Sequence, residues 1–238
     1  MSKLYIIATP IGNLKDITLR ALGTLEEVDL ILCEDTRVTK KLLNHYNIKT
    51  PVQSYHQHSK FKKVNYILKL LRHGENLALV SDSGTPGISD PGSKLVNELM
   101  NNELTSKVKV VPIPGPNAAI AAASISGFPM DKFLFLGFPP HKKGRQKFFK
   151  EAADSKYSVI IYESPHRILK TLRELKELKN FDLVIGRELT KKFETIYRGR
   201  IKEIIEQLEK EKPKGEFVIV IKNLPAGRQD LPAGRQGL

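Results

Sequence analysis

The sequence predicts an α/β fold with two successive α/β domains, and three observations lead to this prediction. The chain has 238 residues, enough for one large domain or two ordinary ones of about 100 to 200 residues each. Its apolar fraction of 40% and charged fraction of 27% are typical of a globular protein that buries a core. Short β-branched runs alternate with longer helical patterns through the first half, which indicates strand-helix-strand units and a largely parallel sheet.

Five short apolar runs are the expected strands of the first domain. They cover residues 4–9, 29–34, 52–56, 77–81 and 108–113. Between the third and fourth runs, apolar residues from Phe61 to Leu71 recur at helical spacing, and Gly74 stands where a left-handed helix cap is expected. Asp90 and Pro91 have the pattern of an N-cap and a first-turn proline, so a second helix is expected after them.

The segment 112–116 (PIPGP) marks the expected domain boundary, because its prolines block both a helix and a central strand. We therefore expect domains at 1–113 and 114–223. The second domain has expected strands at 133–138, 158–162, 182–189, 194–199 and 216–221, and expected helices at 142–153, 165–178 and 200–211, the middle helix capped by Ser164 and Pro165. Residues 224–238 repeat LPAGRQ without apolar periodicity, so we expect a flexible tail there.

The charge of the chain favours an anionic partner, and a merely basic cytosolic enzyme is the alternative. Lysine and arginine number 39 against 26 acidic residues, a formal net charge of +13, which favours nucleic acid or an acidic membrane. The apolar run at 4–8 is too short for a signal peptide or a membrane span, so no membrane association is expected. Cys33 is the single cysteine, which excludes an intrachain disulfide and favours the reducing cytoplasm.

Two loops have the composition of a ligand site. Residues 80–92 (VSDSGTPGISDPG) combine three glycines with two prolines after a strand, and glycine lets the backbone approach a ligand closely. Ligands of open α/β sheets bind beyond the carboxyl ends of strands, although an ordinary strand-to-helix turn is the alternative. The first turn, 9–14 (TPIGNL), also contains a proline and a glycine, which allow a tight exit from the strand and a close approach of the backbone to a ligand. Neither G-x-G-x-x-G after the first strand nor a P-loop is present, which counts against a classical dinucleotide enzyme and a P-loop NTPase.

Seven motifs together carry a specific resemblance. They are TPIGNL at 9–14, EDTR at 34–37, VSDSGTPGISDPG at 80–92, PGP at 114–116, YESPHR at 162–167, RELTK at 187–191 and KGE at 214–216. In order and spacing they resemble the tetrapyrrole (corrin/porphyrin) methylase-like superfamily, and within it the ribosomal RNA branch. The resemblance implies two α/β domains with mixed five-stranded sheets, a cleft between them for S-adenosylmethionine, and 2'-O-ribose methylation of a cytidine in the decoding region of 16S rRNA by a cytoplasmic homodimer.

The resemblance also implies which residues form the site. Carried over position by position, the cofactor-binding residues are Pro10, Gly12, Asp82, Ser83, Gly84, Thr85, Pro114, Gly115, Pro116, Ala118, Ser124, Tyr162 and Leu189. Close helix packing is the alternative for the small side chains of Ala118 and Ser124. A ribose hydroxyl is a poor nucleophile at neutral pH, so a base or a charge near the forming alkoxide would help. Our candidates for the base are Glu163 and Glu188, with Arg187 or Arg37 holding a phosphate or the acceptor oxygen. A structural role in an Arg-Glu pair is the alternative for each.

Basic residues suggest where RNA binds. The run 141–150 (HKKGRQKFFK) contains no acid, and its candidate phosphate contacts are Lys142, Lys143, Arg145 and Lys147. A second basic cluster consists of Arg37, Lys40, Lys41, Lys60, Lys62 and Lys63. A solvated helix face is the alternative for the first run. His56 and His58 share one face of a strand, but without a third clear ligand we expect no metal site.

Two other functions stay open at this point. A methylase of a small tetrapyrrole precursor would have an apolar, less basic cleft. A non-catalytic RNA-binding protein would explain the charge equally well but would need no cofactor cleft, so calorimetry with S-adenosylmethionine separates it from an enzyme.

Overall fold

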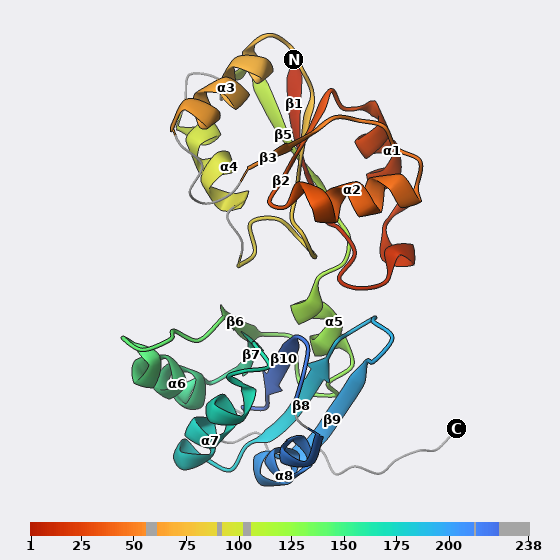
Figure 1. Ribbon diagram of the computed structural model, residues 1–238. Helices are drawn as coiled ribbons and strands as arrows, with labels where there is room; N and C mark the ends of the chain where they lie inside the picture. Colours follow the sequence, from red (N-terminus) through yellow and green to blue (C-terminus); the bar gives the residue numbers. More distant parts are fainter. Residues whose placement is uncertain (56–60, 90–91, 102–105, 212, 224–238) are drawn as a thin grey trace, which may run out of the picture. The chain divides into compact units, whose positions relative to one another are not determined.

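A computed structural model describes residues 1–55, 61–89, 92–101, 106–211 and 213–223 (Figure 1). The predictions for His56, His58, Lys60, Asp90, Pro91 and the tail 224–238 lie outside these residues. The chain divides into two compact units, each built on a sheet of five strands. The first unit contains Met1–Ala118 together with Leu189–Lys192, and the second contains Ala119–Glu188 and the chain from Phe193 onward.

The sheet of the first unit is parallel throughout, as the alternation of strands and helices predicts, and not mixed. Its strands are β1 (Ser2–Ile7), β2 (Leu30–Cys33), β3 (Val52–Ser54), β4 (Leu77–Val80) and β5 (Val108–Ile113), in the order β3-β2-β4-β1-β5. The connecting helices are η1 (Leu14–Asp16), α1 (Leu19–Glu27), α2 (Thr36–His45), α3 (Phe61–Arg72) and α4 (Gly92–Met100).

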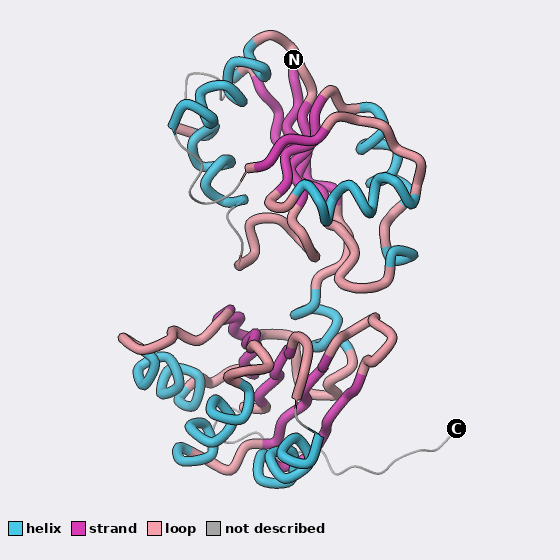
Figure 2. Tube along the Cα trace, viewed as in Figure 1, coloured by secondary structure: helices cyan, strands magenta, loops and turns pink. Residues whose placement is uncertain are grey.

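Helices cover both faces of this sheet, as Figure 2 shows. Successive residues of a strand point to opposite faces, so β1 serves two cores. Leu4 packs with buried residues of α3 and α4, whereas Ile7 packs with those of α1 and α2. The strands therefore consist of nearly continuous apolar runs, which is typical of a parallel sheet buried on both faces.

The second unit has a mixed sheet. Its elements are α5 (Ala118–Ser124), whose first residue still belongs to the first unit, β6 (Phe133–Gly137), α6 (Arg145–Asp154), β7 (Ser158–Glu163), α7 (Ile168–Leu178), β8 (Asp182–Arg187), β9 (Thr195–Arg200), α8 (Ile201–Glu211) and β10 (Phe217–Ile221). The strand order is β6-β7-β10-β8-β9, in which β6 and β7 are parallel and the other neighbours are antiparallel. Phe149, Leu172 and Ile204, from α6, α7 and α8, share one core with the sheet.

Three predicted boundaries in the second unit are wrong, each for a local reason. Helix α6 begins at Arg145 and not at 142, because Gly144 adopts a left-handed conformation with φ 85°. Helix α7 begins at Ile168, and its predicted cap Ser164 instead opens a turn in which its carbonyl accepts the N–H groups of Arg167 and Ile168. Strand β8 ends at Arg187, because the φ of 51° at Glu188 breaks the strand. Among the described residues, no helix is long and apolar enough to cross a membrane.

Candidate cofactor and substrate site

The loops that follow β1 and β4 are joined at the carboxyl edge of the first sheet. Adjacent parallel strands end at the same edge, so their following loops meet there. Thr9 and Gly84 exchange both backbone hydrogen bonds, at 2.9 and 3.1 Å. The Thr9 hydroxyl also donates to the carbonyl of Ser81 at 3.0 Å. The segments TPIGNL and SDSGTPG are thus joined through Thr9, and Pro10, the next residue, is buried.

The loop after β5 joins the same group. A Cβ on Gly115 would lie 3.0 Å from the Cβ of Ala8, so a larger residue would push this loop away from the end of β1 by a few tenths of an ångström. The Thr85 hydroxyl donates to the carbonyl of Pro116 at 3.1 Å. Gly84 has a φ of 80°, and a Cβ there would meet Ile11 and the Pro116 carbonyl. The predicted cofactor residues in the loops after β1, β4 and β5 of the first unit therefore lie together.

Residues Leu189–Lys192 complete this group, although they are far away in the sequence. The N–H of Asn13 donates to the hydroxyl of Thr190 at 3.1 Å. A Cβ on Gly12 would overlap the side chain of Lys191 and would lie 2.8 Å from the Thr190 hydroxyl oxygen. Leu189 is buried, and Thr190 has a φ of 66°, a conformation that non-glycine residues adopt at a cost. Sequence patterns do not reveal the contact with Thr190.

The EDTR segment connects to this group through Asp82, whose carboxylate accepts the N–H of Asp35 at 3.0 Å. Asp35 is the N-cap of α2 and accepts the N–H of Arg37 at 2.8 Å. The Arg37 guanidinium binds the same carboxylate at 2.6 Å and holds the pKa of Asp35 at about 2. Since 86% of the Arg37 side chain is exposed, a second anion can still reach it.

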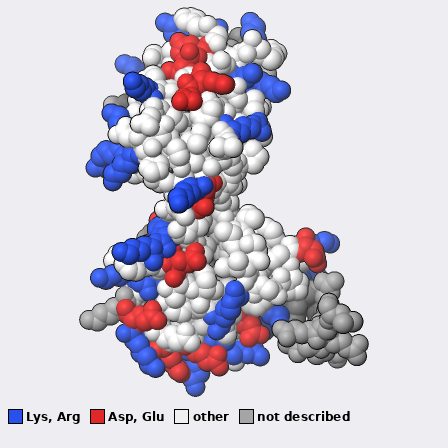
Figure 3. Space-filling model, turned by 90° about the vertical axis from the view of Figure 1, so that its right-hand side faces the viewer, with Lys and Arg blue, Asp and Glu red and all other residues white. Residues whose placement is uncertain are grey.

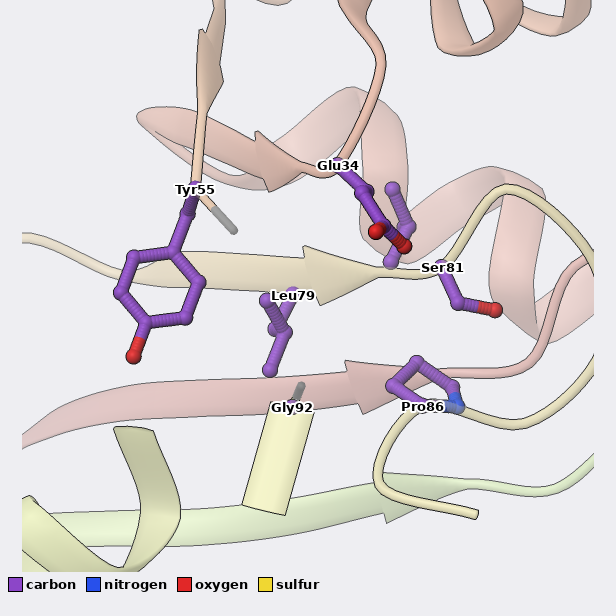
Figure 4. A pocket seen from close by; sticks show the side chains of 7 residues that line it. Glu34, Tyr55, Leu79, Ser81, Pro86 and Gly92 are labelled. Carbon is purple, nitrogen blue, oxygen red and sulfur yellow. The ribbon is translucent and has the colours of Figure 1, made fainter. Parts of the chain in front are cut away.

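A recess at the carboxyl ends of β2, β3 and β4 was not anticipated from the sequence (Figure 4). It is lined by Glu34, Tyr55, Leu79, Val80, Ser81, Pro86 and Gly92. The hydroxyl of Tyr55 is buried and has no hydrogen-bond partner among the described residues, and burial raises its pKa. The one sequence feature that could have indicated this recess is an aromatic residue, Tyr55, near the end of the expected strand 52–56, at the carboxyl edge of the sheet.

In the second unit, Tyr162 is held by contacts on several sides. Its hydroxyl accepts the N–H of Ala119 at 3.2 Å, and its ring packs against Phe135 and Phe138 with centroids 5.0 and 5.4 Å away. Burial raises its pKa, so the phenol stays neutral. Ala118 is half-buried at the start of α5, whereas Ser124 is exposed and donates to the carbonyl of Ala121.

Glu163 is buried and fully engaged by its own unit. One carboxylate oxygen accepts the N–H of Ser164 at 2.7 Å and binds the Arg167 guanidinium at 2.8 Å. The other oxygen accepts the hydroxyl of Thr171 at 2.6 Å. Only 1% of the residue is exposed. Because Ser164, Arg167 and Thr171 all hold this carboxylate from within its own unit, the geometry favours the structural alternative for Glu163.

Arg187 and Glu188 connect the RELTK segment to the KGE segment. Arg187 donates to the carbonyl of Lys214 at 2.8 Å and binds Glu211 at 3.2 Å. The N–H of Glu188 donates to the carbonyl of Glu216 at 2.9 Å, and the Glu188 carboxylate accepts the N–H of Glu216 at 2.8 Å. Glu188 is half-exposed, unlike Glu163.

The basic run of the second unit is only partly available to RNA. Lys142, Lys143 and Lys147 are exposed, but the prediction that Arg145 contacts phosphate is wrong for this structure. Its side chain is only 7% exposed and binds Glu174 at 2.7 Å. On the face shown in Figure 3, basic side chains occur on both units and are interspersed with acidic ones. Among the described residues no cluster of metal-ligating side chains is present.

The first-unit group can hold a ligand that has both polar and apolar parts. Glycines bring backbone N–H and C=O groups of three loops to one edge, where Asp82 adds a carboxylate and Ser83 is exposed. Carbonyl and carboxylate oxygens attract a cation, and amide N–H groups attract an anion. A positively charged sulfonium with an attached amino-acid group fits this set of donors and acceptors.

Comparison with known proteins gives concordant results. A family model described as Tetrapyrrole (Corrin/Porphyrin) Methylases matches residues 3–205. The "Ribosomal RNA small subunit methyltransferase I" of Thermotoga maritima is 46% identical over 93% of this chain and 98% of that protein. The protein of the same name from Mycoplasmopsis pulmonis is 48% identical over 92% of this chain and 97% of its own. The crystal structure of the methyltransferase CobJ shares the fold, with a TM-score of 0.70 and 18% identity over 94% of this chain and 95% of that one.

Proposed function

The chain belongs to the Tetrapyrrole (Corrin/Porphyrin) Methylases, and on that premise we propose that it transfers the methyl group of S-adenosylmethionine to small-subunit ribosomal RNA. The acceptor in this proposal is the 2'-hydroxyl of a cytidine in the decoding region of 16S rRNA. The observation that carries the proposal is the union of the loops after β1, β4 and β5 with Leu189 and Thr190 at one sheet edge.

S-adenosylmethionine supplies an activated methyl group on a sulfonium. In our proposal Gly84, Gly115 and Gly12 give it access to the backbone, and Asp82 and Ser83 bind its polar parts. The hydrogen bond from Thr85 to the carbonyl of Pro116 holds the loop after β4 against the 114–116 turn. Tyr162, Ala118, Ser124 and Leu189 complete the proposed cofactor site. If the acceptor oxygen were also held in line with the bond that breaks, such positioning would contribute about 7 to 11 kcal/mol, as in well-oriented reactions.

For the base we propose Glu188. It is half-exposed, and the left-handed conformation with φ 51° is a strained backbone of the kind that clusters at functional sites. Arg187 and Glu163 instead have positioning roles in this proposal, since partners in their own unit bind both. Arg37 is the proposed contact to a phosphate, because its guanidinium is exposed.

We place RNA binding on the exposed residues Lys142, Lys143 and Lys147. Each lysine that neutralises a phosphate releases counterions, which makes affinity fall steeply with salt. Charge reversal at Lys142 and Lys143 should weaken RNA binding strongly and leave the affinity for S-adenosylmethionine nearly unchanged. Equal losses for both ligands would argue against this surface.

A cytoplasmic homodimer is the form in which we propose that the protein acts. The buried, unpaired thiol of Cys33 agrees with a reducing compartment. Light scattering of the purified protein measures its mass in solution, and a monomer at working concentrations would refute the dimer.

One experiment separates the three candidate functions. Purified protein is mixed with radiolabelled S-adenosylmethionine and either unmethylated small subunits, free 16S rRNA or a tetrapyrrole precursor, and mass spectrometry then locates the methyl group. Methylation of a cytidine ribose supports the proposal. Methylation of the tetrapyrrole alone supports the first alternative, and RNA binding without affinity for S-adenosylmethionine in calorimetry supports a non-catalytic protein. The first two substrates also distinguish free RNA from assembled subunits.

A further inference from the structure

A chain of buried polar side chains in the second unit connects α7 to the loop that follows β6. Its centre is Thr171, a fully buried residue of α7. The Thr171 hydroxyl donates to Glu163 at 2.6 Å and accepts from the Arg145 guanidinium at 2.7 Å. A hydroxyl has one donor and two acceptor positions, so Thr171 can bind the Glu163 carboxylate and the Arg145 guanidinium at the same time.

Both ends of this chain hold the same turn. Arg145 donates to the carbonyl of Pro140 at 3.1 Å, and Arg167, the ion-pair partner of Glu163, donates to the carbonyl of Pro139 at 2.9 Å. Two consecutive carbonyls are therefore held by two arginines that are themselves connected through Glu163 and Thr171. Proline has no N–H, so the turn depends on its carbonyls for hydrogen bonds.

The anchored turn leads directly into the exposed basic residues. His141, Lys142 and Lys143 follow Pro140 and are exposed, and the carbonyl of Lys142 accepts the N–H of Arg145 at 3.2 Å. The lysines therefore lie on a loop whose backbone is fixed on both sides. Ordering a flexible loop upon binding costs conformational entropy, and a loop that is already ordered avoids most of this cost.

We propose that Thr171 is a positioning residue for RNA binding, which with Arg145, Glu163 and Arg167 holds residues 139–144 so that Lys142 and Lys143 meet RNA phosphates in a preformed arrangement. This inference rests on the proposed function. It also explains why an arginine of the basic run is buried: Arg145 shapes the surface and its neighbours touch the RNA.

The test compares variants that change the hydroxyl, the guanidinium or a surface charge. Thr171→Val keeps the shape of the side chain but removes the hydroxyl, and Thr171→Ser restores it. Arg145→Lys keeps the charge but cannot bind Glu174, Pro140 and Thr171 together. Lys143→Ala removes one proposed phosphate contact. The affinity of each variant for in-vitro-transcribed small-subunit rRNA is measured at several potassium chloride concentrations, and circular dichroism confirms folding.

We expect Thr171→Val and Arg145→Lys to weaken RNA binding about tenfold without changing the slope of log affinity against log salt, because the same phosphates are still contacted in the complex. The affinity of Thr171→Ser for RNA should stay within about twofold of the wild-type value, because serine keeps the hydroxyl; this change is much smaller than the loss of about tenfold expected for Thr171→Val. Lys143→Ala should make this negative slope shallower by about one. The KM for S-adenosylmethionine should not change in the Thr171 variants.

Two results would overturn the inference. Folded Thr171→Val with wild-type affinity would show that the hydroxyl does not matter for RNA, and a slope as shallow as in Lys143→Ala would show that a phosphate contact was lost. If Thr171→Val does not fold, Arg145→Lys decides in the same way. A wild-type protein that methylates no rRNA refutes the proposed function itself, whereas an active wild type with unaffected variants refutes only this inference.

Discussion

Gly215 leaves the space that the side chain of Glu188 occupies. A Cβ on residue 215 would overlap the Cγ and the carboxyl group of Glu188. Gly215 also has a φ of 86°, so two independent constraints require glycine there. The contact brings the KGE and RELTK segments together, and the exchange of hydrogen bonds between Glu188 and Glu216 depends on it.

Gly215→Ala should destabilise the second unit and also lower activity. The matched control is Gly127→Ala in the same unit, where φ is 72° but the added Cβ would meet nothing within 4 Å. We expect the control to cost about 1 to 2 kcal/mol from backbone strain alone, and Gly215→Ala to cost about 1 to 3 kcal/mol more from overlap. Urea unfolding measures both, and equal losses would contradict the steric argument.

Gly12→Ala should weaken the binding of S-adenosylmethionine. A Cβ there displaces Lys191 and Thr190, and with them the segment next to Leu189. Gly23→Ala is the control, because nothing lies within 4 Å of its Cβ on α1 and alanine favours a helix. Titration calorimetry should show a loss of about tenfold or more for Gly12→Ala and none for the control. Unchanged binding in both would remove Gly12 from the proposed site.

Glu188→Gln and Glu163→Gln should have different kinetic effects. If Glu188 is the base, its amide variant should lower kcat by about 100-fold or more at an unchanged KM for S-adenosylmethionine. Glu163→Gln should mainly reduce stability, by about 1 to 3 kcal/mol, because the amide cannot satisfy Ser164, Arg167 and Thr171 together. Single-turnover rates and unfolding curves measure both effects. The reverse pattern would make Glu163 the base.

The ion pair of Asp35 and Arg37 should make the stability of the folded protein depend on pH in the acid range. Arg37 lowers the pKa of Asp35 from 3.8 to about 2, so the folded state releases this proton more readily than the unfolded state. The resulting stabilisation is present above pH 3.8 and is lost as the pH falls toward 2.

Arg37→Met should raise the pKa of Asp35 part of the way back, since the N–H of residue 37 still donates to it. NMR titration of the Asp35 carboxyl measures the change, and Arg20→Met serves as a control on a neighbouring helix. An Asp35 pKa that stays at about 2 in Arg37→Met would rule out the guanidinium as the main cause.

Periodicity predicted the elements well where one residue pattern dictated one local structure. Helix α3 was expected at 61–71 and covers Phe61–Arg72, and β5 matches its expected range of 108–113. The errors occur where a single backbone angle decides, as at Gly144 and Glu188. Local preference for a helix or a strand does not encode such angles, which depend on distant partners such as Glu216.

The candidate site divides in the same way. The glycine-rich loops were predicted as ligand-binding from their composition, and their places after β1, β4 and β5 follow from the strand order. The burial of Arg145 was not predictable, because a basic run looks the same whether its arginine faces solvent or a buried threonine. Tyr55 was missed for a related reason, since its recess is formed by three strands together.

From the sequence alone follow the α/β class, the glycine loops and the family resemblance, because these depend on local preferences and on motifs in order along the chain. Tertiary structure decided which charged residues are available. Arg145 and Glu163 lie in the core of a polar network, whereas Lys142, Lys143 and Glu188 retain access to solvent. The physical reason is that the availability of a charge depends on its partners, and here those partners come from other elements of the fold.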